Sequence, residues 1–141
     1  MNGKFYQILI IVLFTYVCGV AIYTSWGLFQ INLRAKNNEW FYYSVNDKLY
    51  KLKVADNETA YAKGLSGVTK RPGDYDGMIF IFKEKRIMSF WNQGVSLDLD
   101  VFWLEDFKVI GNDTLPAFSK SGLKIITPKQ PVNYAIELFK D

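Results

Sequence analysis

The sequence contains no histidine, and its single cysteine, Cys18, lies near the N-terminus. A Ser-His-Asp triad therefore cannot form, and imidazole ligands for a metal are missing. Beyond Cys18 there is also no thiol for a cysteine nucleophile, a thiolate zinc site or an internal disulfide. Enzymatic chemistry in the rest of the chain would have to use carboxylates, Lys, Tyr, Ser or Thr. A single thiol is compatible with a reducing or an oxidising compartment, so cysteine usage does not indicate a location.

Clusters of basic residues are missing as well. The 17 Lys and Arg and the 14 Asp and Glu give a net charge of +3, and these charges are scattered along the chain. This pattern gives no support to a nucleic-acid partner. Hydrophobic residues make up 50% of the sequence and aromatic residues 17%. The aromatic residues continue well beyond the N-terminal region, which indicates one small domain of about 100 residues with a modest core.

Charge is also absent from residues 5–29, an apolar run of 25 residues. About 20 such residues cross a bilayer as a helix. A cleaved signal peptide has a shorter apolar segment, of about 7–15 residues, that ends in small side chains. This run carries Tyr16, Tyr23 and Trp26 instead. We therefore predict an uncleaved transmembrane helix, with the lipid bilayer as the partner of residues 5–29.

The predicted anchor divides the chain into three parts. These are a signal-anchor helix at residues 1–30, a polar linker at 31–39 and a small β-rich domain at 40–141. Lys4 before the apolar run and Arg34 after it nearly balance under the positive-inside rule. We expect a single-pass membrane protein whose N-terminus is inside and whose C-terminal domain is extracytoplasmic.

Short stretches of alternating or continuous apolar residues follow the linker and predict strands. Strands are expected at residues 41–45, 48–54, 78–82, 87–91, 97–104, 107–110, 123–126 and 132–138. One short helix is expected up to about Lys63, with Asp56 or Asn57 as its N-cap and Gly64 as its stop. Residues 112–122 are expected to be irregular. The fold class is therefore mainly β with one short helix, a small sandwich or barrel-like α+β domain.

Two carboxylates, Asp98 and Asp100, fall on the same face of the strand predicted at residues 97–104. A rise of about 3.3 Å per residue places their Cα atoms about 6–7 Å apart. Such a pair could act as an acid and a base, or hold a divalent cation in a metal-assisted hydrolase. A solvated strand face, with one carboxylate bound to a backbone N–H, is the simpler interpretation, above all for Asp98.

A second group of polar residues follows the predicted strand at 87–91. Trp91, Asn92 and Gln93 place an aromatic ring beside two amides, a mixture that suits a ligand pocket with apolar walls and a few polar groups. A strand ending in a polar turn has the same composition. We expect Trp91, Asn92, Gln93 and Asp100 to line a ligand-binding surface. Trp91 would supply apolar area, the amides hydrogen bonds, and Asp100 a negative charge or a support for the turn.

The order of several short segments resembles the family of the domain of unknown function one-nine-two. The resemblance covers about residues 51–138 and rests on these segments, in this order: Val54-Ala55-Asp56, Gly64-Leu65, Gly77-Met78-Ile79-Phe80-Ile81-Phe82, Phe90-Trp91 and Leu99-Asp100, with a closing Tyr134-Ala135-Ile136-Glu137-Leu138. It implies a compact, mostly β fold with one helix, often behind a signal or an anchor. It implies no particular reaction, since the family has no established activity.

The chain departs from the usual pattern of that family at several positions. Ser66 stands in place of Met, and Asn92-Gln93-Gly94-Val95 stands in place of Met-Lys-Asn-Thr, so a lysine is lost. These observations favour a non-enzymatic, membrane-anchored module that binds a small molecule or a protein partner, without a cofactor or a metal. A hydrolase that uses Asp98 and Asp100, and a structural subunit of a membrane assembly, are the alternatives.

Overall fold

The computed structural model describes residues 39–140, which form eight strands and two short helices. In chain order these are β1 (Trp40–Val45), β2 (Lys48–Ala55), α2 (Glu58–Lys63), β3 (Gly77–Arg86), β4 (Phe90–Trp91), β5 (Leu99–Glu105), β6 (Lys108–Leu115), α3 (Phe118–Ser121), β7 (Ile125–Ile126) and β8 (Val132–Phe139). The prediction of a mainly β domain is confirmed.

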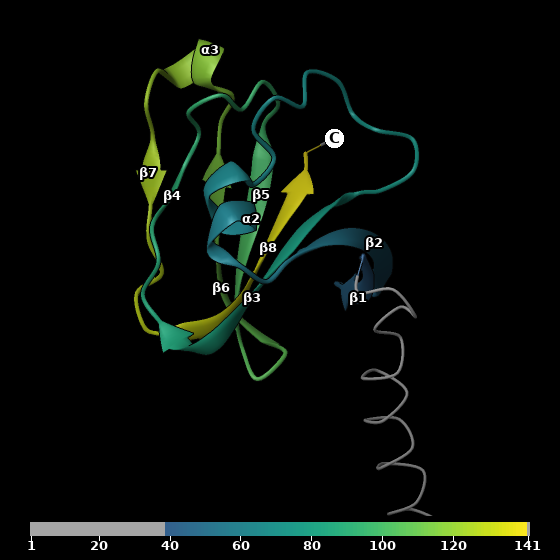
Figure 1. The fold of residues 1–141 in the computed structure, drawn as a ribbon, viewed down its shortest axis with the longest axis vertical. Coiled ribbons are helices and arrows are strands. Elements are labelled where there is room, and N and C mark those ends of the chain that lie inside the picture. Colours follow the sequence, from purple (N-terminus) through teal and green to yellow (C-terminus); the bar gives the residue numbers. More distant parts are fainter. Residues whose placement is uncertain (1–38, 141) are drawn as a thin grey trace, which may run out of the picture. The chain divides into compact units, whose positions relative to one another are not determined.

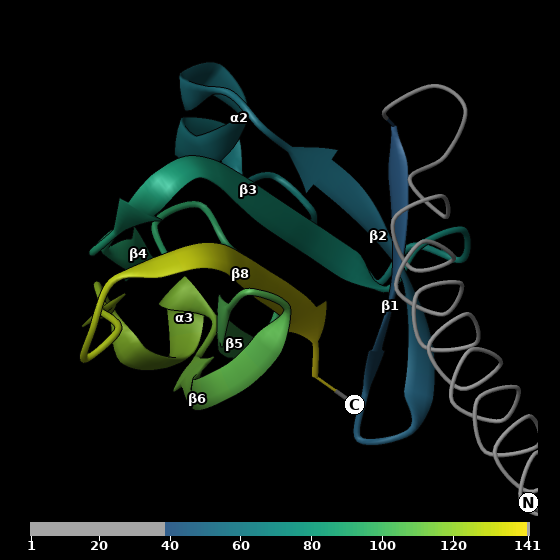
Figure 2. The ribbon, with the colours of Figure 1, turned by 90° about the horizontal axis from the view of Figure 1, so that it is seen from below.

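Six of these strands form one mixed sheet in the order β1-β2-β3-β8-β5-β6. Only β2 and β3 run parallel in this sheet, and the chain between them passes through α2. Parallel neighbours need such a crossover, because a tight turn can join only antiparallel strands. Figure 1 shows α2 lying over the sheet, and Figure 2 shows that β3 and β8 are bent along their length. The short strands β4 and β7 pair separately as a two-stranded ribbon.

The structure corrects the expected elements in several places. A second helix, α3, occupies part of the segment 112–122 that was expected to be irregular. Strand β3 continues through residues 83–86, beyond the strand expected at 78–82, and β4 has only two of the residues expected at 87–91. The prediction of a sandwich or barrel also left out the parallel β2–β3 pair, which makes the main sheet mixed.

Local sequence explains the ends of α2. The side chain of Asn57 accepts a hydrogen bond from the backbone N–H of Ala60 at 3.0 Å, which is a typical N-cap contact. Gly64 ends the helix at φ +47° and ψ −134°, a conformation that glycine adopts far more readily than other residues. The predicted cap and stop of this helix are therefore confirmed.

Apolar side chains cover both faces of the sheet. Ile79 and Phe80 are neighbours in β3, and both are buried, in two different hydrophobic clusters. Because neighbouring side chains in a strand point to opposite faces, this strand is buried on both sides. The continuous apolar run at residues 78–82 follows from this double burial.

The central strand β8 lies unusually close to β3 at Gly77. A Cβ atom at this position would lie 1.9 Å from the carbonyl oxygen of Glu137 and 3.1 Å from the Cα atom of Leu138. Gly77 and Leu138 are register partners in the two strands. Only glycine allows this approach, which places Glu137 in the middle of the sheet.

Within residues 39–140, no helix has the length and apolar character needed to cross a membrane. The anchor predicted at residues 5–29 lies outside the described residues, and it stays a prediction.

Replacement of Gly77 by alanine is expected to destabilise the domain by about 3 kcal/mol, because overpacking against backbone atoms forces the strands apart. Gly73 is the matched control, since nothing lies within 4 Å of a Cβ placed there. Urea denaturation of the full chain in non-ionic detergent, followed by tryptophan fluorescence, measures both variants. Equal stability of Gly77→Ala and Gly73→Ala would contradict the close approach.

Candidate functional site

Asp98 holds the segment that leads into α3. Its carboxylate accepts a hydrogen bond from the backbone N–H of Ala117 at 2.8 Å and forms an ion pair with Lys120 at 2.6 Å. The hydrogen bond from Ala117, followed by that from Lys120, lowers the pKa of Asp98. This contact with a backbone N–H agrees with the simpler interpretation of Asp98 as a structural residue.

Asp100 has different partners from those of Asp98. It accepts a hydrogen bond from the hydroxyl of Thr114 at 3.1 Å and forms an ion pair with Lys140 at 3.4 Å. None of these hydrogen bonds and ion pairs joins the two carboxylates to each other. Across residues 39–140 no group of three or more His, Cys, Asp or Glu side chains is placed to hold a metal ion.

Asn92 is completely buried, and its side-chain amide joins neighbouring segments by hydrogen bonds. Its Nδ2 atom donates to the carbonyl oxygens of Pro116 and Gly122, each at 2.9 Å, and to the hydroxyl of Ser121 at 3.0 Å. Its Oδ1 atom accepts from the backbone N–H of Lys124 at 2.8 Å. The amide thus ties the β4 turn to α3 and to the start of β7. It is absent from the lining of the pocket described next.

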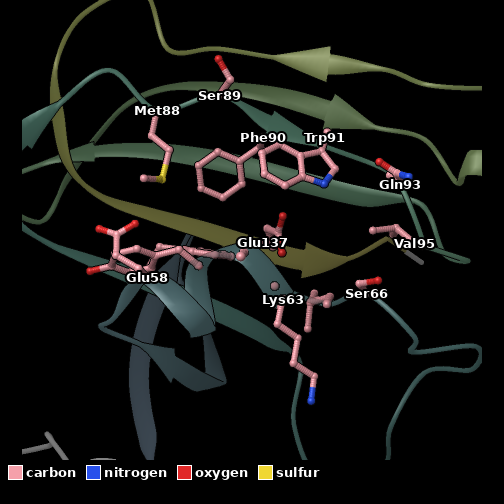
Figure 3. A pocket seen from close by; sticks show the side chains of 15 residues that line it. Glu58, Lys63, Ser66, Met88, Ser89, Phe90, Trp91, Gln93, Val95 and Glu137 are labelled. Carbon is pink, nitrogen blue, oxygen red and sulfur yellow. The ribbon is translucent and has the colours of Figure 1, made fainter.

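Trp91 and Gln93 line a pocket of about 150 Å³ between α2 and the β4 segment (Figure 3). Aromatic side chains form part of the wall of this pocket. Its aromatic side chains are Tyr61, Phe80, Phe90 and Trp91. Trp91 is 46% exposed, which places it at the rim rather than in the core. Of the four residues predicted to form a binding surface, the structure brings Trp91 and Gln93 together here, and it places Asn92 and Asp100 elsewhere.

Glu137, on β8, contributes a carboxyl group to the same pocket (Figure 3). The side chain is 4% exposed, and its register partners are the apolar Met78 on β3 and Val101 on β5. Its Oε2 atom is the one fully buried side-chain nitrogen or oxygen within residues 39–140 that has no hydrogen-bond partner. Buried polar atoms are normally satisfied, so this exception needs a physical reason.

Burial raises the pKa of the Glu137 carboxyl to about 8, from an ordinary value of 4.5. The cause is desolvation, which disfavours the charged form when no donor compensates for lost water. Glu137 is therefore mostly protonated at neutral pH. A neutral carboxyl group can donate one hydrogen bond and accept others, whereas the ionised group can only accept.

Glycines shape the part of the pocket that faces this carboxyl. At Gly64, a Cβ atom would lie 3.6 Å from Oε2 of Glu137. At Gly94, where φ is +75°, a Cβ atom would lie 2.3 Å from Oγ of Ser66. The backbone N–H of Gly67 donates to the carbonyl of Gly94 at 2.9 Å. The loop after α2 and the turn after β4 are thus packed directly against each other at one edge of the pocket.

A second depression, of about 450 Å³, shares residues 63–66 with this pocket, and Lys53, Tyr75 and Met78 contribute to its lining. Glu137, whose Oε2 is the single fully buried side-chain nitrogen or oxygen without a partner in residues 39–140, does not line this depression. The pocket at Glu137 is therefore the stronger candidate for a binding site.

Sequence reasoning did not select Glu137 as a site residue. The available signal was a single acidic residue in the strand Val132–Phe139, whose only other strongly polar residue is Asn133. A charged residue in a strand needs no special explanation when one face of the sheet is exposed to solvent. It becomes informative once both faces are known to be buried, and burial depends on the position of β8 between β3 and β5.

The fold and the pocket define a small mixed-sheet domain with one buried, unpaired carboxyl. A family model described as "Uncharacterized ACR" matches residues 42–141. The chain belongs to this family, the domain of unknown function one-nine-two. The comparison with curated proteins found no match.

Two solved structures share the fold. One is a protein from Sinorhizobium meliloti 1021, provisionally described as a transcription regulator, with 22% identity, a TM-score of 0.56, and coverage of 70% of this chain and 76% of that chain. The other is a protein of unknown function from Novosphingobium aromaticivorans, with 16% identity, a TM-score of 0.59, and coverage of 71% and 73%. At these identities the likeness concerns the fold alone.

Several positions at which this chain departs from the usual family pattern line the pocket. These are Ser66, Gln93 and Val95.

Replacement of Glu137 by glutamine is expected to remove a pH dependence of stability. The unfolded carboxyl ionises near pH 4.5 and the folded one near 8. Between these values the unfolded chain binds fewer protons, so the stability that this group contributes is complete below 4.5 and is lost as the pH rises to 8. The slope is about 1.4 kcal/mol per pH unit.

The measurement is urea denaturation of the full chain in detergent at several pH values from 4.5 to 9. The stability difference between wild type and Glu137→Gln should change steadily up to about pH 8 and then level off. Glu84→Gln, at an exposed position of β3, is the control and should keep the wild-type slope. Parallel curves for wild type and Glu137→Gln would contradict a raised pKa.

Proposed function

We propose that this chain is a small-molecule-binding module whose domain, at residues 40–141, is held at a membrane by residues 5–29 and lies outside the cytoplasm. The binding site is the pocket between α2 and β4. The observation that carries this proposal is the buried Oε2 atom of Glu137, which has no partner in a pocket lined in part by aromatic rings.

The composition of the pocket supports binding. Small-molecule sites are concave and mostly apolar, with a few polar groups that fix the orientation of the ligand. Here the aromatic wall supplies apolar area, Gln93 at the rim supplies an exposed amide, and Glu137 supplies the buried polar group. A ligand that hydrogen bonds to Oε2 would recover energy that the folded domain loses by leaving this atom unpaired.

The contacts of the two aspartates weigh against the alternative of a metal-assisted hydrolase. Asp98 already binds a backbone N–H and Lys120, and Asp100 already binds Thr114 and Lys140. A cation would have to displace these partners from each carboxylate. The proposal therefore assigns Asp98 and Asp100 to the support of the fold and not to chemistry.

The anchor part of the proposal rests on the sequence. Residues 5–29 are uncharged over 25 positions, and aromatic residues at 23, 26 and 29 suit the interface between lipid and water. A tether of this kind would hold the pocket close to the membrane surface.

Blocking the pocket is expected to abolish binding of small probes. Ala62 is exposed on α2 and lines the pocket, whereas Thr59 is exposed on the same helix and does not. In a fluorine NMR screen of uncharged fluorinated fragments with the full chain in detergent, wild type and Thr59→Trp should broaden the same fragment signals. Ala62→Trp should lose these effects. No broadening with wild type, or equal broadening with all three proteins, would refute a binding pocket here.

Deletion of residues 5–29 is expected to release the chain from membranes. The full chain, expressed in a bacterial host, should remain with the membrane pellet after an alkaline carbonate wash, because each apolar side chain is stabilised in lipid. The shortened chain should appear in the supernatant. Recovery of the full chain from the aqueous fraction without detergent would contradict the anchor.

A further inference from the structure

We infer that the pocket at Glu137 recognises a primary alkylammonium group, which enters with its charge toward the carboxylate and its short apolar stem along the aromatic wall. This inference rests on the proposed binding function and names the class of ligand.

The carboxyl group determines the polar end of the ligand. Oε2 of Glu137 is buried, without a hydrogen bond, and Met78 and Val101 flank it on the neighbouring strands. The partner that an unpaired carboxylate binds most strongly in apolar surroundings is a cationic hydrogen-bond donor. An anionic ligand would instead meet a group that repels it when ionised.

No basic side chain that lines the pocket pairs with Glu137, whose pKa shift has desolvation as its only cause. The charged or titratable groups that line the pocket are Glu58, Tyr61 and Lys63, all on α2, together with Glu137. The lining residues from β3 and from the segment that contains β4 carry no charged or titratable side chain. Glu58 pairs with Arg86 at 3.4 Å. Figure 3 shows the Lys63 side chain extending away from Glu137. Within residues 39–140 no basic side chain therefore pairs with Glu137, and a ligand can supply the cationic donor.

The aromatic part of the wall suits the cation and the stem of an alkylammonium ion. The rings of Phe80 and Phe90 lie edge to face, with centroids 4.7 Å apart, beside the rim residue Trp91. Aromatic faces attract cations, and they also pack against methylene groups. The same domain already pairs ammonium groups with rings, since Nζ of Lys51 lies 4.2 Å from the centroid of the Trp40 ring.

The size of the pocket limits the ligand. A volume of about 150 Å³ accommodates a molecule about the size of benzene. A short alkylamine fits, as does the terminal aminoalkyl group of a longer molecule that extends past Trp91. Guanidinium and quaternary ammonium groups are broader at the charged end and are expected to bind less well.

Binding of an alkylammonium ion is coupled to release of a proton. In the free protein the pKa of Glu137 is raised to about 8, so the group is protonated at neutral pH. When the alkylammonium ion enters, the carboxyl proton leaves to solvent, and a carboxylate–ammonium pair forms. Affinity should therefore rise about tenfold per pH unit below pH 8 and level off above it.

Isothermal titration calorimetry of the full chain in detergent tests the inference with three probes of similar shape: n-butylammonium, n-butanol and butyrate. Each titration is run at pH 6.5 and pH 9 in two buffers of different ionisation enthalpy. We expect n-butylammonium to bind more tightly than n-butanol at pH 9, with release of about one proton at pH 6.5 and almost none at pH 9. Butyrate should not bind at pH 9, where the ionised carboxylate repels it.

The variants and the neutral probe separate the possible failures. Glu137→Gln should bind n-butylammonium at least tenfold more weakly at pH 9 and should show no proton release, whereas Glu84→Gln should match wild type. If n-butanol binds and n-butylammonium does not, the inference is overturned and the binding pocket stands. If neither probe binds and the fragment screen is also blank, the inference and the proposed function both fail. Equal binding of n-butylammonium by Glu137→Gln and wild type would also overturn the inference.

Discussion

The position of β8 between β3 and β5 is the constraint on which the rest of the domain depends. Gly77 lets β3 approach this strand so closely that any side chain there would meet the backbone of Glu137. The two hydrophobic clusters then cover the two faces of the sheet, and Glu137 lies between apolar register partners on both sides. Burial of one carboxyl group is thus a consequence of how the sheet is assembled.

The polar groups around this sheet differ in how well they are satisfied. Asn92 is also buried, yet it makes four hydrogen bonds that hold α3 and the approach to β7. Asp98 and Asp100 each have two partners. Glu137 has a buried oxygen without any, and an apolar residue of similar size in its place would avoid the cost of desolvating a carboxyl group. The exception lies in a pocket with an aromatic wall, which is why binding is the function that we propose.

The elements that the sequence predicted well are those determined by neighbouring residues. Asn57 and Gly64 set the ends of α2 through contacts within a few positions, so both were predictable. The four-residue helix α3 has no side-chain cap of its own and depends on Asn92 and Asp98, which are distant in sequence, so local patterns could not reveal it. The parallel pairing of β2 with β3 is likewise a long-range contact that periodicity does not encode.

The candidate site also combines features that depend on neighbouring residues with features that depend on long-range contacts. Composition around Trp91 and Gln93 pointed to the pocket, whereas Glu137 became significant only through the strands beside it.

The carboxyl carbon of Glu137 can be followed by NMR in ¹³C-glutamate-labelled protein, with Glu137→Gln to assign the signal. The account predicts a titration midpoint near 8, the value that burial gives this group. A midpoint near the ordinary value of 4.5 would show a solvated or paired carboxylate and would contradict the central claim.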